Sequence, residues 1–145
     1  AVNRHPQNAD FRGLLLLQRS NNHILPLIDA LHGYVDELNN LKSTALQERG
    51  MCASMTESLH FLLGLVADQA KGEDVERDML KRLTADRSTV MTRFRNEIVV
   101  NSAQSNATRE ALFVATGLFE RMVWLIRQLS TDIDLAGSDH TGAKP

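Results

Sequence analysis

The sequence has little of what disulfide-bonded, nucleic-acid-binding or membrane-spanning proteins require. Its one cysteine, Cys52, excludes a disulfide within the chain and is compatible with a reducing compartment. Sixteen basic and eighteen acidic residues leave a net charge of -2, so the positive excess typical of nucleic-acid-binding proteins is absent. Basic residues between positions 77 and 95 alternate with acidic ones, which predicts a solvated helix face. Uninterrupted apolar runs such as Leu14–Leu17 and Ala111–Ala115 are far shorter than the roughly 20 residues that cross a bilayer.

Sequence motifs of catalysis and of metal binding are also absent. The chain has no glycine-rich phosphate loop, no cysteine pair with zinc spacing and no serine nucleophile motif. Glu57 and His60 have the Glu-x-x-His spacing of di-iron bundles, but such sites need a second copy of the motif, which the sequence lacks. We therefore expect no enzyme, no metal and no cofactor, and interpret both residues as surface residues.

The sequence is rich in apolar residues at the three- and four-residue spacing of helices. Residues 10–48 predict one long helix or two, with a kink near Pro26 because the proline ring crowds the preceding turn, and with a stop at Gly50. Further helices are predicted over about 51–70, ending at Gly72, over about 74–100, with a weak middle near Arg87, and after the polar turn 101–106. The apolar stripe expected in the first helix comprises Leu14, Leu17, Ile24, Leu27, Leu31, Tyr34, Leu38 and Leu41.

Four helices with short polar connections predict an all-α fold, an antiparallel four-helix bundle with up-down-up-down order. The length of 145 residues corresponds to about one domain. We expect this domain to span residues 1–136, and the small polar residues 137–145 to form a flexible tail.

Apolar residues beside the main stripes predict an interaction surface. They are Leu15, Leu16, Leu112 and Phe119. The surface predicts self-association or contact with membrane-embedded partner regions, and a function through protein contacts. The aromatic residues leave two interpretations open, ordinary core packing or a pocket for a small aromatic ligand. They include Phe61, Phe94, Phe113, Phe119 and Trp124.

Two segments resemble helices of a known family. They are Asp10–Leu38, which reads DFRGLLLLQRSNNHILPLIDALHGYVDEL, and Ala111–Leu129, which reads ALFVATGLFERMVWLIRQL. The first is similar to the helix that follows the first membrane half in the fusaric acid resistance family of aromatic-acid efflux proteins. The second is similar to the helix that precedes their second membrane half. Together the two segments cover about a third of the chain.

The resemblance implies a cytosolic helical region between two membrane-embedded halves, in a protein that exports aromatic carboxylic acids or similar compounds with a periplasmic adaptor. The chain is then expected to be that region alone, on the cytoplasmic side of the inner membrane, and no functional residue of the family transfers to it. Two other classes stay open. One is a four-helix ligand-sensing domain of a bacterial receptor, which would be periplasmic and have a ligand pocket. The other is a phosphate-uptake-type regulatory helical bundle, which Glu120-Arg121 weakly favours.

Overall fold

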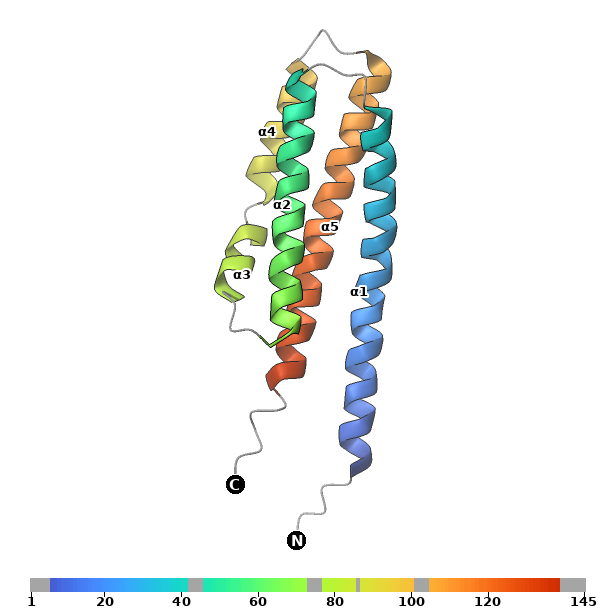
Figure 1. Ribbon diagram of the computed structural model, residues 1–145, viewed down its shortest axis with the longest axis vertical. Helices are drawn as coiled ribbons and strands as arrows, with labels where there is room; N and C mark the ends of the chain where they lie inside the picture. Colours follow the sequence, from blue (N-terminus) through green and yellow to red (C-terminus); the bar gives the residue numbers. More distant parts are fainter. Residues whose placement is uncertain (1–5, 42–45, 73–76, 86, 101–104, 139–145) are drawn as a thin grey trace.

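The computed structural model describes residues 6–41, 46–72, 77–85, 87–100 and 105–138, and these form helices and no strands. The all-α class is therefore confirmed. Figure 1 shows the helices side by side, and α5 contacts each of the other four. The five helices are α1 (Pro6–Asn40), α2 (Leu46–Ala70), α3 (Arg77–Ala85), α4 (Arg87–Val100) and α5 (Asn106–Ser138).

The end of α2 agrees with its sequence signal, whereas its beginning does not. After Ala70 the chain turns through Gly72, whose positive φ of 79° is a conformation that glycine adopts at little cost. The backbone N–H of Gly72 donates to the carbonyl oxygen of Gln69 at 3.1 Å, which closes the last turn. Gly50, expected to stop the first helix, lies inside α2 instead, because α1 already ends at Asn40.

The helix expected over about 74–100 corresponds to α3 and α4, which lie on either side of residue 86, a position outside the described residues. The two segments meet beside Arg87, where the apolar repeat is weak. Near the end of α3, the hydroxyl of the buried Thr84 donates to the carbonyl oxygen of Leu80 at 2.8 Å. A threonine that bonds to its own helix in this way stays buried without any partner from another helix.

The last helix begins at a serine cap. The Ser105 hydroxyl accepts a hydrogen bond at 3.1 Å from the backbone N–H of Thr108, one of the donors that a first helical turn leaves unpaired. At its other end α5 continues through Gly137 and Ser138, the first two positions of the expected tail. The remainder of that segment, 139–145, lies outside the described residues.

The core is formed where four helices pack on α5. Its large buried side chains include Tyr34 of α1, Met55 of α2 and Met91 of α4. The helices α1 and α5 approach closely at Gly33, where an added Cβ would lie 3.3 Å from Cδ1 of Leu118. On the α5 side the core consists of Leu112, Ala115, Phe119, Met122, Val123, Leu125, Ile126 and Leu129.

The apolar stripe expected in the first helix combines two faces of α1. Leu27 packs on the core, whereas Leu17, ten positions earlier, points about 80° away at about 100° of rotation per residue. The helix makes most of its contacts with α5, so this second face has no neighbour within the described part of the chain. The prediction is wrong for three residues, which are 62%, 64% and 38% exposed: Leu14, Leu17 and Ile24.

One segment, Arg49–Ala70 of α2, is long and apolar enough to cross a membrane by length and composition alone, with a mean hydropathy of 1.2. Core helices of proteins that never enter a membrane meet the same criterion. Met55, Leu59 and Leu62 of this segment are buried in the core.

Candidate functional site

The four residues predicted to form the interaction surface do not share one surface. Leu112 is fully buried and Phe119 is 9% exposed, so both belong to the core and their assignment to a surface is corrected. They lie on the face of α5 that the other helices cover. Leu16 is partly buried, and only Leu15, at 48% exposure, is open to solvent.

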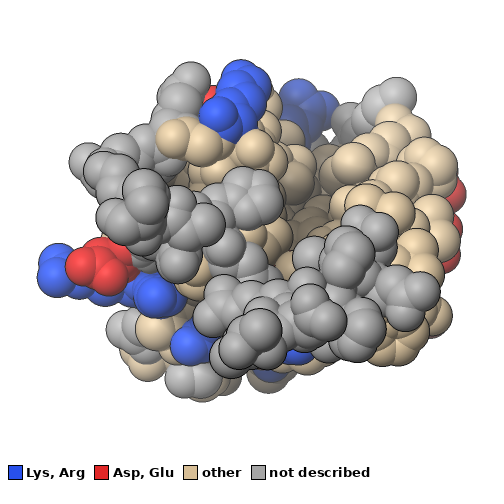
Figure 2. Space-filling view, turned by 90° about the horizontal axis from the view of Figure 1, so that it is seen from below, with Lys and Arg blue, Asp and Glu red and all other residues tan. Residues whose placement is uncertain are grey.

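A different apolar surface lies on α1, which we call the outer face of α1. Its residues are Leu14, Leu17, Ile24, Leu25, Ile28 and Val35, exposed by 38% to 64%. They expose on the order of 500 Å² of apolar area, which is near the upper limit for the largest patch on a typical monomer. Figure 2 shows the side formed by α1 largely without charge, with acidic atoms at its right-hand edge. Sequence reasoning missed this face because three of its residues, Leu14, Leu17 and Ile24, also fit the apolar stripe expected to face the core.

A buried carboxylate joins α1 to α5. Asp132 of α5 is 1% exposed, and its Oδ2 lies 2.7 Å from Nδ1 of His23 on α1. Its Oδ1 lies 2.7 Å from Nε of Arg19, an ion pair without the angle of a hydrogen bond. The His23 ring also meets Trp124 edge-on, with ring centroids 6.2 Å apart. The sequence contains one indication of this site. Asp132 follows Leu125 by seven residues, or about two helical turns, so a carboxylate stands on the apolar face of α5.

A second polar contact joins α2 to α5 through Ser130 and Asp134, two residues before and after Asp132. The Ser130 hydroxyl donates to Oε1 of Gln69 at 2.7 Å, and Nε2 of Gln69 donates to the Ser130 carbonyl oxygen at 3.1 Å and to Asp134 at 2.8 Å. Lys81 of α3 lies 3.9 Å from the Asp134 carboxylate. These bonds satisfy the buried polar groups of Gln69 and Ser130. The cluster therefore positions α2 and α3 against α5.

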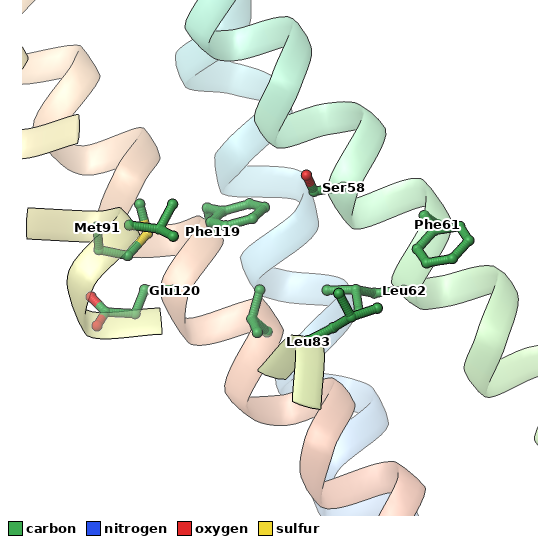
Figure 3. Close-up of a pocket in the computed structure, with 9 residues that line it drawn as sticks. Ser58, Phe61, Leu62, Leu83, Met91, Phe119 and Glu120 are labelled. Carbon is green, nitrogen blue, oxygen red and sulfur yellow. The ribbon is translucent and has the colours of Figure 1, made fainter. Parts of the chain in front are cut away.

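An apolar pocket of about 210 Å³ lies between α2, α3, α4 and α5. Figure 3 shows the Phe119 ring extending from α5 toward α2. Two of the aromatic residues considered for a ligand pocket, Phe61 and Phe119, line it, whereas Phe94 packs on the core and Phe113 and Trp124 are partly exposed elsewhere on α5. The lining consists of Ser58, Phe61, Leu62, Leu83, Val90, Met91, Phe119, Glu120 and Val123.

The two polar residues of this pocket are engaged with the protein. The Glu120 carboxylate pairs with Arg95 of α4, with Nη2 and Oε2 2.6 Å apart, and in Figure 3 it points away from the pocket. The Ser58 hydroxyl donates to the carbonyl oxygen of Ser54 at 2.8 Å. The pocket is thus suited to an uncharged apolar molecule of about the size of benzene or slightly larger, since an apolar cavity of about 150 Å³ holds benzene.

Tyr34 makes a polar contact between α1 and α2. Its hydroxyl lies 3.2 Å from Oγ1 of Thr56, which itself donates to the carbonyl oxygen of Cys52 at 2.8 Å. Burial raises the pKa of the Tyr34 phenol above its usual 10.0, and the hydrogen bond with Thr56 offsets only part of this effect. A tyrosine with a raised pKa is neutral at physiological pH, so it serves packing and hydrogen bonding.

The remaining candidates are not assembled into a site. Glu57 and His60 are both exposed on α2, as surface residues are expected to be. His32 is exposed on α1, away from the partly buried His23. Among the described residues, no group of three or more His, Cys, Asp or Glu side chains could hold a metal ion.

Comparison with family models, with curated proteins and with solved structures finds no match. The resemblance to the fusaric acid resistance family therefore rests on the segments of α1 and α5 quoted above.

Proposed function

We propose that this chain is a non-catalytic helical region that acts through protein contacts, within a membrane exporter of aromatic carboxylic acids or similar compounds. The outer face of α1 is the observation that carries the proposal. Surfaces that meet a protein partner are depleted in charge and rich in large apolar residues at their centre. Leu17 and Leu25, each 64% exposed, fit that composition.

The arrangement of the first and last helices supports the exporter context. The two segments that resemble the family lie in α1 and α5, which pack against each other. In Figure 1 α1 begins and α5 ends at the same end of the molecule. Membrane halves attached to these two ends could both enter one membrane surface, with the region on the cytoplasmic side of the inner membrane. The periplasmic side is the alternative.

The finer topology belongs to the same proposal. We infer an antiparallel bundle with up-down-up-down order, in which α3 and α4 together take the third position. Pro26 lies inside the continuous α1, and its missing N–H is expected to kink the helix there.

Export by the full-length protein tests the proposed function. Replacing Ile24 and Ile28 together by glutamate places charge on the outer face of α1, where both are partly exposed at 38% and 43%, without entering the core. We expect export of an aromatic carboxylic acid from cells to fall at least about tenfold, because a buried unpaired charge disrupts a contact. The matched control is Leu15→Glu, on the other side of α1 and 48% exposed. Unchanged export in the double variant would contradict a role for this face.

The apolar pocket favours ligand sensing as a second candidate function. A protein that senses a small uncharged aromatic molecule would bind it there and be stabilised by binding. Indole is a suitable probe, and it should raise the thermal unfolding midpoint of the chain. Val90→Trp at the 48% exposed rim should fill the pocket and remove the shift, whereas Val114→Trp, 42% exposed on α5, should retain it. If neither the chain nor the control responds to indole, an indole-sized ligand is ruled out.

A further inference from the structure

The outer face of α1 is part of a heptad repeat. Apolar residues alternate at steps of three and four along the helix, which is the pattern of a two-stranded coiled coil. The first position of each heptad is taken by Leu14, Asn21, Ile28 and Val35, and the fourth by Leu17, Ile24, Leu31 and Leu38. Leu31 and Leu38 lie at the border with the core, while the others face outward.

Charged residues avoid this repeat. At about 100° per residue, every Asp, Glu and Arg between residues 11 and 41 lies at least about 100° from the centre of the repeat. These residues are Arg12, Arg19, Asp29, Asp36 and Glu37. A helix that binds a lipid surface would carry basic residues beside its apolar face, and this one carries none there. The face is thus suited to another apolar helix.

The residue types favour a second copy of the same helix in parallel orientation. Parallel dimers prefer β-branched residues at the first heptad position and leucine at the fourth, and Ile28 and Val35 satisfy the first preference as Leu17 and Leu31 satisfy the second. A single asparagine at a first position, here the exposed Asn21, fixes the register of such dimers because it pairs with its own copy. Each first position meets the same position of the partner only in the parallel, in-register arrangement.

The outer face of α1 supplies more than half of the area that a stable dimer buries on each partner. Stable interfaces bury about 800 Å² on each partner. The apolar residues of the face expose on the order of 500 Å². Polar residues at its border, His32 and Asn39, add further uncharged area. His32 and Asn39 carry no fixed charge, so both side chains can be covered by a second copy of α1.

We propose that two copies of this chain associate through a parallel, in-register coiled coil of their α1 helices, centred on the pair of Asn21 side chains. The inference rests on the proposed protein-contact function and names its partner. The two membrane-facing ends of each copy would then point the same way, as two copies of one exporter require.

Sedimentation and cross-linking of the full chain test the inference. At high micromolar concentration the wild-type mass should be twice the 16.2 kDa of one chain. Replacing Ile24 and Ile28 by glutamate should return it to one chain with an unchanged circular dichroism spectrum, while Leu15→Glu should leave the dimer intact. A chain that stays monomeric, or a dimer that the double variant retains, overturns the inference.

Disulfide cross-linking tests the orientation and does not depend on the stability of the glutamate variants. In a Cys52→Ser background, Asn21→Cys should form a covalent dimer on mild oxidation, whereas Asp29→Cys, about 100° from the centre of the repeat, should not. A mixture of the Asn21→Cys and Leu31→Cys chains is also oxidised. If Asn21→Cys forms a disulfide only with Leu31→Cys and not with its own copy, the helices are antiparallel and the inference is overturned. The chain could also prove monomeric while the outer-face variants still abolish export in the full-length protein. That result would overturn the second copy as the partner and retain the protein-contact function.

Discussion

His23 and Asp132 are separated by 109 residues in the sequence, and their side chains meet at 2.7 Å between α1 and α5. The carboxylate is 1% exposed and the imidazole side chain 17%. The second carboxylate oxygen lies beside Arg19, whose side chain is 51% exposed. This contact links the two helices that resemble the exporter family, and it lies on the side of α1 that faces α5, away from the outer face.

His23→Ala is expected to lower the free energy of unfolding by about 1.5–3 kcal/mol, the range for a hydrogen bond to a charged group. The variant removes one of the two partners of a buried carboxylate, and Asp132 cannot turn toward water without moving the helix. Arg19→Ala should cost less than about 1 kcal/mol, because its half-exposed side chain already contacts solvent. Urea unfolding followed by circular dichroism measures both effects.

His60→Ala is the matched control, since this histidine is exposed on α2 and lies away from the outer face of α1. It should change the free energy of unfolding by less than about 0.5 kcal/mol. Equal effects of the two histidine variants would mean that the contact between His23 and Asp132 contributes no measurable stability.

Two glycines at the end of α2 should respond to alanine with opposite signs. Gly72 has a φ of 79°, where a Cβ is strained, so Gly72→Ala should cost about 1–2 kcal/mol. Gly64 is an exposed residue inside the same helix with open space around it, so Gly64→Ala should stabilise by about 0.5–1 kcal/mol. Thermal unfolding of the two variants side by side measures this difference. A loss of stability in both would show that the conformation at Gly72 is not the cause.

The fold class could be predicted because helical spacing and caps are local signals. Gly72 marks the end of α2 by its own conformational preference, and the long apolar repeat of α5 predicts that helix almost to its observed end. The bounds of α3 and α4, which end at Ala85 and begin at Arg87, are finer than the apolar repeat can predict, because the repeat is read over windows longer than one residue. The start of α2 is offset because Gly50 is tolerated inside a helix at modest cost.

The candidate sites were harder to predict because spacing does not tell which of two apolar faces is buried. On α1, Leu17 and Leu27 both fit a helical repeat, and only the position of α5 decides that Leu27 packs inside. On α5, Leu112 and Phe119 lie beside the main apolar stripe, and they are buried because a central helix with four neighbours buries apolar residues around much of its circumference. The pairing of His23 with Asp132 depends on tertiary structure alone.

Leu125 tests the core of the last helix. The side chain is 3% exposed, so Leu125→Ala should lower the free energy of unfolding by about 2–5 kcal/mol through lost burial and the cavity left behind. Leu135→Ala is the control on the same helix, because Leu135 is 44% exposed and should change stability by less than about 0.5 kcal/mol. Chemical denaturation of the two variants measures both changes in the free energy of unfolding. A change below about 0.5 kcal/mol for Leu125 would place it on the surface.

Tyr34 makes stability depend on alkaline pH. Burial raises the pKa of its phenol above 10.0 in the folded protein, while the unfolded chain keeps the ordinary value. Below about pH 10 the phenol is neutral in both states, and the stability it provides is fully present. As the pH rises from there through the folded pKa, only the unfolded state releases the proton, so the free energy of unfolding falls by up to about 1.4 kcal/mol per pH unit.

The chain has one tyrosine, so its phenolate absorbance reports Tyr34 alone. We expect the absorbance titration of the folded protein to have its midpoint above that of the chain in concentrated urea. Tyr34→Phe removes the ionisable group and keeps the ring, so the alkaline slope of stability in this variant should be shallower than in the wild type, with lysine titration common to both. If the folded and unfolded midpoints coincide, the hydroxyl is open to water and the contact with Thr56 does not bury it.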